Sequence, residues 1–317
     1  MKAMVYHDYG SLDNLELQEV EMPAVKDDEV LVKTHAASVN WHDWHFLMGT
    51  PFMARMMAGG LFKPKNSVLG SDMAGRVEAV GASVKQLRPG DEVFGSTRHG
   101  CFAEYVCVSE EELVTKPASI TFESAAAAGA AAFTALQGLR DAGQIKPGQQ
   151  VLINGASGGV GTFAVQIAKA FGANVTGVCS TRNLDMVLSI GADQVVDYTQ
   201  EQVTQSEKRY DLIFDVVAKL LFSECEPALG PKGIYATTAF SPGLALRGLW
   251  SSVTGGKRMV PLMGKRPSVK DHVLMKEFLE AGKVKAVIDR EYSLAQVPQA
   301  LRYLEGGHTR GKIVIRM

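Results

Sequence analysis

The pattern of apolar and polar positions changes near residue 120, and the predicted secondary structure changes with it. Before that point, short segments alternate apolar and polar residues between turn-forming stretches such as Arg88-Pro-Gly-Asp91. Alternation with a period of two is typical of strands with one buried face, so we expect an all-β, barrel-like unit here. The predicted strands are Met4–Tyr6, Leu15–Glu19, Val30–His35, Ser67–Val80 and Phe102–Val108.

After residue 120, strand-like runs alternate with segments of helical periodicity. A helix is predicted from Val160 to Phe171, because Phe163, Ile167 and Phe171 recur every four residues and Gly172 can end it. Strands that alternate with helices favour a parallel, doubly wound sheet. Further strands are expected at 151–154, 174–179, 194–197, 210–217, 233–238 and 287–289, and further helices at 183–190, 269–281 and 296–304. A last strand, 312–315, is one that can return to the first unit.

The segment Val151–Gly161 reads VLINGASGGVG and joins the first strand of the second part to its first helix. A dinucleotide pyrophosphate needs this order of strand, glycine turn and helix. Side chains must be absent where the backbone approaches the phosphates, and the helix N-terminus must point its free N–H groups at the anion. The sequence fits this fingerprint with an alanine in place of the first glycine. The predicted cofactor-binding residues here are Ala156, Ser157, Gly158, Gly159, Val160 and Gly161.

Composition narrows the protein classes that fit. The 317 residues suggest roughly two domains, and a formal net charge of −1 gives no global attraction to nucleic acid or membranes. The alanine-rich run Ala125–Leu139 is shorter than the ~20 residues of a membrane span. The four cysteines lack C-x-x-C spacing, so they signal neither a zinc knuckle nor a disulfide framework. We therefore expect a cytoplasmic globular protein with reduced thiols.

The segment from Trp41 to Gly60 is dense in aromatic residues, methionines and histidines. It is broken by Gly49 and Pro51, so we expect it to be rich in loops. Its apolar residues are either ordinary core or a methionine-rich lid over a hydrophobic substrate. For His42 the alternatives are a metal ligand and a surface or loop imidazole, and the second is favoured because no partners for a metal site can be identified.

The chain resembles the medium-chain dehydrogenase/reductases, in particular their zinc-independent quinone oxidoreductase and alkenal/enone reductase branch. The resemblance covers essentially the whole chain. It rests on the ordered motifs Ala36–Asp43, Leu69–Gly75, Leu87–Gly95, the glycine turn, Gly191–Tyr198 and the terminal Gly311-Lys-Ile-Val-Ile. It implies an α/β fold: a GroES-like β-barrel catalytic domain from 1–121 and 269–317, a Rossmann domain with a doubly wound parallel sheet from 122–268, and an active site in the cleft. It also implies a homodimer, the usual state in this family.

The zinc-independent branch of the family is indicated by the residues that stand where its zinc-dependent members carry zinc ligands. Zinc alcohol dehydrogenases resemble this chain but carry a cysteine where Asn40 stands and Gly-His-Glu where Gly70-Ser71-Asp72 stands, together with a four-cysteine lobe that this sequence lacks. Asn40 and Ser71 are poor zinc ligands, and Asp72 alone cannot complete a catalytic site. We therefore expect no metal. Reducing a simple ketone produces a basic alkoxide that zinc stabilises, whereas reducing an activated double bond produces a delocalised enolate, for which preorganised hydrogen-bond donors suffice.

The resemblance also implies roles for single residues. Asn40 matches an asparagine that lines the nicotinamide and substrate pocket. His45 stands where quinone reductases carry a tyrosine and alkenal reductases a lysine, so we expect it to donate a hydrogen bond to the substrate carbonyl, the alternative being a packed histidine that shapes the pocket. Thr134 and Phe240 are expected beside the nicotinamide. Arg310 or Lys312 is expected to close the cleft from the tail.

The residues after the second strand of the second part predict which dinucleotide binds. NAD enzymes place a carboxylate there for the ribose hydroxyls, whereas this chain reads Ser180-Thr181-Arg182. Two hydroxyls and a guanidinium suit a 2′-phosphate, which a carboxylate would repel. NADP(H) is therefore the expected cofactor, and Tyr198 matches a family tyrosine near the same phosphate.

These observations predict an NADPH-dependent, zinc-independent oxidoreductase that reduces an α,β-unsaturated carbonyl (an enone or alkenal) or a quinone. The alternatives are an enoyl-thioester reductase and a redox-silent NADPH-binding protein of crystallin-like or regulatory type. The expected partner is a small hydrophobic electrophile, with neither nucleic acid nor membrane involved.

Overall fold

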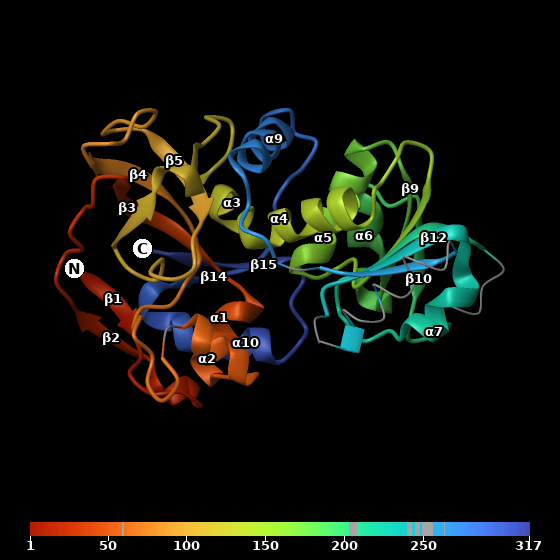
Figure 1. The fold of residues 1–317 in the computed structure, drawn as a ribbon, viewed down its shortest axis with the longest axis horizontal. Coiled ribbons are helices and arrows are strands. Elements are labelled where there is room, and N and C mark those ends of the chain that lie inside the picture. Colours follow the sequence, from red (N-terminus) through yellow and green to blue (C-terminus); the bar gives the residue numbers. More distant parts are fainter. Residues whose placement is uncertain (59, 203–207, 240–242, 245–247, 249–255, 263) are drawn as a thin grey trace. The chain divides into compact units, whose positions relative to one another are not determined.

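The chain forms two compact units, shown as a ribbon in Figure 1. A computed structural model describes residues 1–58, 60–202, 208–239, 243–244, 248, 256–262 and 264–317. Unit 1 consists of Met1–Ala131, Pro267–Glu280 and Ala286–Met317, and unit 2 consists of Ala132–Arg266 and Ala281–Lys285. The second unit is therefore inserted between two parts of the first.

Unit 1 is built on a seven-stranded sheet in the order β14-β15-β3-β4-β5-β7, with β6 also paired to β3. All pairs are antiparallel except the parallel pair β14–β15. The alternating burial of β3 confirms that one of its faces packs on the core. The strands are β3 (Glu29–Val39), β4 (Asp72–Val80), β5 (Glu92–Ser96), β6 (Tyr105–Ser109), β7 (Leu113–Thr115), β14 (Ile288–Ser293) and β15 (Lys312–Arg316), beside a separate hairpin of β1 (Lys2–Val5) and β2 (Glu16–Glu19).

The last strand returns to the first unit, as its pattern predicts. β15 pairs antiparallel with β3, with Ile313 opposite Val39 and Ile315 opposite Ala37. Ile313 and Ile315 are buried in the core of unit 1. This pairing places Lys312, at the start of β15, beside the end of β3, where Asn40 follows.

The segment after β3 forms two helices, so the expectation that it is rich in loops is wrong. Helix α1 (Trp41–Met48) begins after Asn40, whose backbone N–H donates to Oδ2 of Asp43 at 2.8 Å, and ends at Gly49 in the left-handed conformation. A second short helix, α2 (Phe52–Met57), follows Pro51. The glycine and proline therefore punctuate two helices instead of interrupting a loop. The other α-helices of unit 1 are α3 (Phe122–Ala127), α9 (Val269–Glu280) and α10 (Val297–Glu305).

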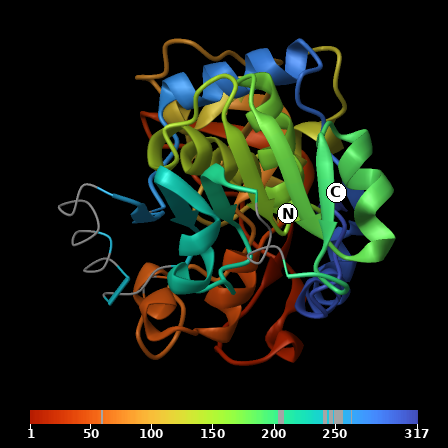
Figure 2. The ribbon, with the colours of Figure 1, turned by 90° about the vertical axis from the view of Figure 1, so that its right-hand side faces the viewer.

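Unit 2 contains the predicted parallel, doubly wound sheet, whose strands lie side by side in Figure 2. The strand order is β10-β9-β8-β11-β12-β13, and every pair is parallel. In order of the chain this is 3-2-1-4-5-6, the order of dinucleotide-binding folds. Its strands are β8 (Gln150–Asn154), β9 (Asn174–Cys179), β10 (Gln194–Asp197), β11 (Tyr210–Asp215), β12 (Leu229–Thr237) and β13 (Arg258–Pro261), of which the last was not expected.

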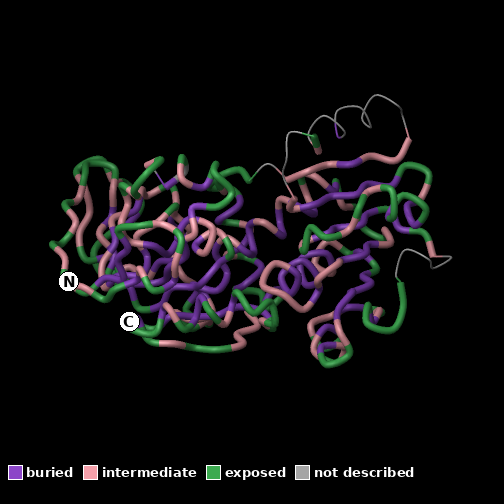
Figure 3. Tube along the Cα trace, turned by 90° about the horizontal axis from the view of Figure 1, so that it is seen from below, coloured by how far each residue is buried: buried purple, intermediate pink, exposed green. Residues whose placement is uncertain are grey.

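Helices lie on both faces of that sheet. In Figure 1, α5 (Gly159–Ala170) and α6 (Leu184–Ser189) lie on one face and α7 (Phe222–Cys225) on the other. Helix α4 (Ala130–Gln137) leads from unit 1 into unit 2. In Figure 3, buried residues occupy the interior of each unit, whereas exposed residues lie mainly at its periphery. Among the described residues, no helix is both long enough and apolar enough to cross a bilayer.

Candidate active site

The turn between β8 and α5 has the shape that a close approach of phosphate requires. Gly155 has a φ of +84°, and the N–H of Gly158 donates to its carbonyl at 3.1 Å. A Cβ added at Gly161 would lie 2.0 Å from the carbonyl oxygen of Gly155, so only glycine fits there. A Cβ added at Gly158 would meet no atom nearer than 3.5 Å. The space beside Gly158 is therefore open for a ligand that a side chain would obstruct.

The N-terminus of α5 adds hydrogen-bond donors to this turn. Gly158 is the N-cap residue, no side chain caps it, and the first turn of the helix contains no acidic residue. Its free N–H groups and the positive end of the helix dipole favour a bound anion. Ala156 is fully buried, and its N–H donates to the carbonyl of Val178 at 3.0 Å, which fixes the turn against β9. The residues present therefore fit a dinucleotide pyrophosphate.

A buried carboxylate joins the ends of the two central strands. Asn154, the last residue of β8, donates from Nδ2 to Oδ1 of Asp215 at 2.7 Å, and Asp215 ends β11. The hydroxyl of Tyr235 also donates to Asp215, at 3.0 Å. The strand order reverses between β8 and β11, and ligands of doubly wound sheets bind outside the carboxyl ends of the strands at such a point. The glycine turn lies at this edge because it follows β8 directly.

The residues predicted to select the cofactor lie after β9. Ser180 is the N-cap of the 3₁₀ turn Thr181–Asn183, which precedes α6, and the exposed Arg182 lies within this turn. Asn183, which sequence reasoning missed, is buried, and its Nδ2 donates to Oγ of both Ser157 (3.1 Å) and Ser180 (3.2 Å). It thereby joins the glycine turn to the end of β9. Its position directly after Arg182 was the only signal in the sequence.

Thr181 is engaged within the protein. Its hydroxyl donates to Oδ2 of Asp197, the last residue of β10. Hydrogen bonds from Thr181 and Thr199 lower the pKa of Asp197. The hydroxyl proton of Thr181 is therefore used by Asp197, whereas Ser180 accepts from Asn183 and keeps its own proton to donate.

The other predicted contacts of the cofactor are less informative. Tyr198 follows β10 and is 62% exposed. Thr134 lies partly exposed on α4. Phe240 lies outside the described residues. The roles predicted for Tyr198, Thr134 and Phe240 stay predictions.

In unit 1, Asn40 lies at the centre of a buried polar cluster. Its side-chain Nδ2 donates to Oδ2 of Asp72 at 2.8 Å and to the carbonyl of Ser38 at 3.4 Å, and its Oδ1 accepts from Nζ of Lys312 at 2.5 Å. Asn40 is only 8% exposed. Both ends of its amide are thus held by the protein. Its predicted catalytic role stays a prediction, and its position is fixed by Asp72 and Lys312.

Lys312 and Asp72 bring opposite charges into this cluster. Nζ of Lys312 lies 3.7 Å from Oδ2 of Asp72 and donates to the carbonyl of Val39 at 3.1 Å, and both side chains are buried. Asp72 also accepts from Oγ of Ser38 and from the N–H of Ala130, each at 2.8 Å. Burial lowers the pKa of Lys312, and the attraction of Asp72 opposes that shift. Of the three residues that stand in the positions of the zinc-binding motifs, Asn40 and Asp72 bond to each other and to Lys312, whereas Ser71 bonds to His42 and Asp43.

His42 is part of the same region but lies on helix α1 and not in a loop. Its Nε2 is hydrogen-bonded to Oγ of Ser71, which donates to Oδ1 of Asp43 at 2.8 Å. Asp43 is fully buried, and burial raises the pKa of its carboxyl group. Within the described ranges, no three His, Cys, Asp or Glu side chains are grouped so that they could hold a metal ion.

His45 faces the other end of α1. Its Nδ1 lies 2.7 Å from the carbonyl oxygen of Thr50. A carbonyl only accepts, so Nδ1 carries the proton of the neutral ring and Nε2 keeps a lone pair. His45 can therefore donate from Nε2 to a substrate only as an imidazolium. Its ring packs edge-on against Trp44, with centroids 5.2 Å apart.

The apolar residues of 41–57 divide between the two predicted fates. Phe46 and Leu47 are buried in the core of unit 1. Others are exposed to about half of their surface or more: Trp41 (47%), Phe52 (63%), Met53 (59%) and Met56 (58%). Core packing thus explains part of the segment, and α2 presents Phe52, Met53 and Met56 to solvent.

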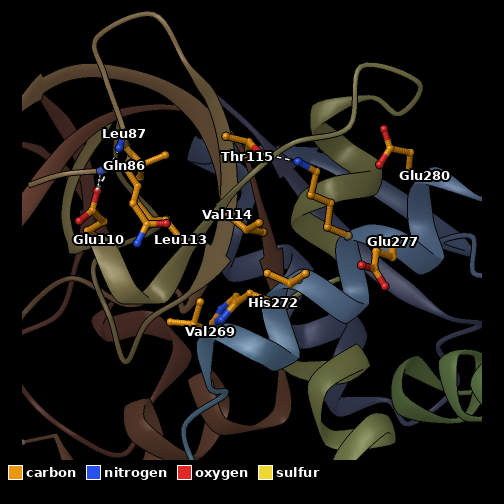
Figure 4. A pocket seen from close by; sticks show the side chains of 12 residues that line it. Gln86, Leu87, Glu110, Leu113, Val114, Thr115, Val269, His272, Glu277 and Glu280 are labelled. Carbon is orange, nitrogen blue, oxygen red and sulfur yellow. Dashed lines mark hydrogen bonds between the residues drawn. The ribbon is translucent and has the colours of Figure 1, made fainter.

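A separate pocket of about 430 Å³ opens in unit 1 between α9 and the strand β7 (Figure 4). Leu113, Thr115 and His272 line it, and Nζ of Lys276 donates to Oγ1 of Thr115 at 2.7 Å. None of the predicted site residues lines this pocket.

Two family models match the chain. Residues 26–118 match the alcohol dehydrogenase GroES-like domain, which confirms the fold expected for unit 1, and residues 190–315 match a family described as zinc-binding dehydrogenase.

Individual proteins match over the whole chain. The 2-methylene-furan-3-one reductase of Solanum lycopersicum is 36% identical over 99% of this chain and 79% of its own length. The chloroplastic NADPH-dependent alkenal/one oxidoreductase of Arabidopsis thaliana is 34% identical over 99% of this chain and 79% of its own length. The structure of the quinone oxidoreductase from Coxiella burnetii superposes with a TM-score of 0.89 at 28% identity, over 100% of this chain and 99% of that one.

Proposed function

The chain belongs to the medium-chain dehydrogenase/reductases, in their branch of quinone and alkenal/one oxidoreductases, and we propose that it is an NADPH-dependent, zinc-independent reductase of enones, alkenals or quinones. The observation that carries this proposal is the open glycine turn at the end of β8. The free space beside Gly158 and the uncapped N-terminus of α5 suit a dinucleotide pyrophosphate.

The residues around the turn favour NADPH over NADH. Ser180 and Arg182 offer a hydroxyl proton and a positive charge after β9, where NAD enzymes place a carboxylate. Asn183 holds Ser157 and Ser180 together, so the phosphate-binding turn and the ribose end are positioned by one amide. When bound, NADPH supplies a hydride to the substrate.

The proposal that no zinc takes part rests on the residues themselves. Asn40 and Asp72 occupy positions of zinc ligands, yet their polar atoms bond to each other and to Lys312. The ammonium group supplies the positive charge that balances Asp72 in this buried cluster. Without a Lewis acid, the site favours substrates whose reduction yields a delocalised anion, such as enones, alkenals and quinones.

At the substrate end, we assign His45 the role of hydrogen-bond donor to the carbonyl oxygen. Because Nδ1 is directed to Thr50, the donor is Nε2 of the imidazolium. If this assignment holds, substrate reduction requires His45 in its protonated form. The exposed apolar residues of α2, among them Phe52 and Met53, suit a hydrophobic substrate.

The test is an assay of NADPH oxidation with an alkenal, an enone, a quinone, an enoyl-thioester and a simple ketone. We expect turnover with the first three, no turnover with the ketone, and the same rates after dialysis against a chelator. Metal analysis of the purified protein serves as the control for bound zinc. Turnover of the ketone that a chelator abolishes would overturn the zinc-free assignment, and NADPH-dependent reduction of the enoyl-thioester alone would favour the enoyl-thioester alternative.

We also propose that the protein works in the cytoplasm as a homodimer. The four cysteines form no disulfide, which agrees with a reducing compartment. The dimer is the usual state of this family and is tested by analytical ultracentrifugation, in which a single monomeric species would contradict it.

A further inference from the structure

Three side chains of unit 1 form a continuous hydrogen-bonded chain that leads from the protein interior to its surface. Nε2 of His42 is bonded to Oγ of Ser71, and Oγ of Ser71 lies 2.8 Å from Oδ1 of Asp43. Asp43 and Ser71 are buried, whereas the side chain of His42 is 36% exposed. The second carboxylate oxygen of Asp43 accepts from the N–H of Asn40 at 2.8 Å, so the inner end of the chain is fixed.

Ser71 allows the hydrogen bonds between His42 and Asp43 to exist in two arrangements. In one, the His42 ring is an imidazolium that donates from Nε2 to Ser71, and Ser71 donates to the Asp43 carboxylate. In the other, a protonated Asp43 donates to Ser71, and Ser71 donates to Nε2. A hydroxyl group can donate and accept at once, so the arrangements differ only by the transfer of one proton between His42 and Asp43. Burial, which disfavours the charged carboxylate, narrows the free-energy difference between them.

The outer nitrogen of His42 is the group that can act on a ligand. Among the residues that the structure describes, none is hydrogen-bonded to its Nδ1. His45 differs, because its Nδ1 is taken by Thr50 and its Nε2 has no proton in the neutral ring. In the arrangement with protonated Asp43, neutral His42 carries its proton on Nδ1 and can donate it.

We propose that His42, supported by Ser71 and Asp43, delivers the proton that completes the reduction, an inference that rests on the proposed function. The β-carbon of the enone gains a hydride, which leaves an enolate. The enolate takes the proton from Nδ1 of His42 while Nε2 receives the Ser71 proton and Ser71 receives that of Asp43. The double bond is reduced, NADPH is oxidised, and Asp43 is left as a carboxylate. Solvent then returns one proton through the exposed ring.

Several charged or titratable groups face the hydrogen-bonded side chains of His42, Ser71 and Asp43 from neighbouring elements. Asp72 on β4 disfavours the Asp43 carboxylate, and Lys312 on β15 favours it. Burial raises the pKa values of Tyr6 and Cys101, so both are neutral in the range of the experiment. His42 and Asp43 are therefore the two groups that we expect to exchange a proton in the pH range of the experiment.

The first experiment uses the protein without cofactor or substrate. In protein labelled with ¹⁵N-histidine, we expect the Nδ1 and Nε2 shifts of His42 to change in two steps with pH, one for its own ring and one for Asp43. Ser71→Ala should remove the step that reports Asp43, while the exposed His7 gives the same curve in both proteins. Identical His42 curves with and without Ser71 would overturn the relay.

The second experiment measures turnover with NADPH and an enone. His42→Gln keeps a donor toward Ser71 but cannot transfer a proton, so kcat should fall about 100-fold or more, the usual contribution of a general acid, with little change in KM. His42→Ala should be rescued by added imidazole, and His7→Ala should behave as wild type. If the wild type is active and His42→Gln is equally active, the proton relay is overturned but the proposed function is not. Inactivity of the wild type with every substrate would overturn the proposed function, and the histidine shifts would still test the hydrogen-bonded chain.

Discussion

Nζ of Lys312 lies 2.5 Å from Oδ1 of Asn40, although 272 positions separate the two residues in the chain. The pairing of β15 with β3 brings them together, and the buried Asp72 shares the lysine. Replacing Lys312 with Met should leave Asp72 buried without its counter-charge. Removal of one member of a buried pair costs about 3–5 kcal/mol, so we expect the free energy of unfolding in urea to fall by about that amount.

A second substitution separates charge from packing. Adding Asp72→Asn to Lys312→Met removes the unpaired charge and should recover part of the lost stability. The exposed Arg316, which pairs with both Glu123 and Glu291, gives the control, because each surface ion pair contributes about 0–1 kcal/mol. A loss for Lys312→Met no larger than that for Arg316→Ala would show that the lysine does not neutralise Asp72.

Two glycines of the cofactor turn should respond differently to alanine. At Gly161 a Cβ would lie 2.0 Å from the carbonyl of Gly155, so Gly161→Ala should strain the turn and destabilise the fold by about 1–3 kcal/mol. At Gly158 the nearest atom is 3.5 Å away and φ is −84°, so Gly158→Ala should change stability by less than about 0.5 kcal/mol. The added methyl group should still raise the Kd for NADPH about tenfold or more, equivalent to ~1.4 kcal/mol.

Thermal unfolding and NADPH titration of both variants check this pair of expectations. Gly158→Ala is the informative variant, because it changes the space beside the turn without changing the turn. Unaltered NADPH affinity in Gly158→Ala would mean that the phosphates do not approach this glycine.

Local sequence patterns predicted most of unit 2. The strands at Asn174–Cys179 and Gln194–Asp197 have the predicted bounds, and the helix predicted from Val160 runs from Gly159 to Ala170. Such elements depend on periodicity and on glycine stops, which neighbouring residues in the chain reveal. The same holds for the glycine turn, because its strand and helix are adjacent in sequence.

The candidate site of unit 1 was harder to predict. Helix α1 was missed because its start depends on a hydrogen bond between Asn40 and Asp43, and its apolar residues do not all face one way. The contacts of Asn40 with Asp72 and Lys312, and of His42 with Ser71, join segments 29 to 272 positions apart. Only the sheet brings these residues together, so no local pattern contains them.

The thiol of Cys107 should be unreactive at neutral pH. Burial, assisted by the nearby Glu29 carboxylate, raises its pKa to about 11. The thiolate is the nucleophile. At pH 8 the fraction of Cys107 that is ionised should therefore be smaller in the folded protein than in the unfolded protein, whose cysteines have a pKa of about 8.5. The rate of alkylation by iodoacetamide, followed by mass spectrometry, should rise about tenfold per pH unit up to about pH 10. A plateau near pH 9 would contradict the raised pKa, and urea-unfolded protein is the control.

Arg182 should decide between the two nicotinamide dinucleotides. It is exposed in the 3₁₀ turn that follows β9, between Ser180 and Asn183, whose side chains are hydrogen-bonded to each other, with Asn183 also bonded to Ser157 of the glycine turn. If its guanidinium binds the 2′-phosphate, Arg182→Ala should weaken NADPH binding by about 1.5–3 kcal/mol, the range of a hydrogen bond to a charged group. NADH has no 2′-phosphate, so its affinity should stay the same. Calorimetric titration of both cofactors gives the ratio directly, with the exposed Arg88→Ala of unit 1 as the matched control. An unchanged ratio of NADPH to NADH affinity in Arg182→Ala would refute the assignment, and the preference would then have to come from Ser180 and the residues that hold it.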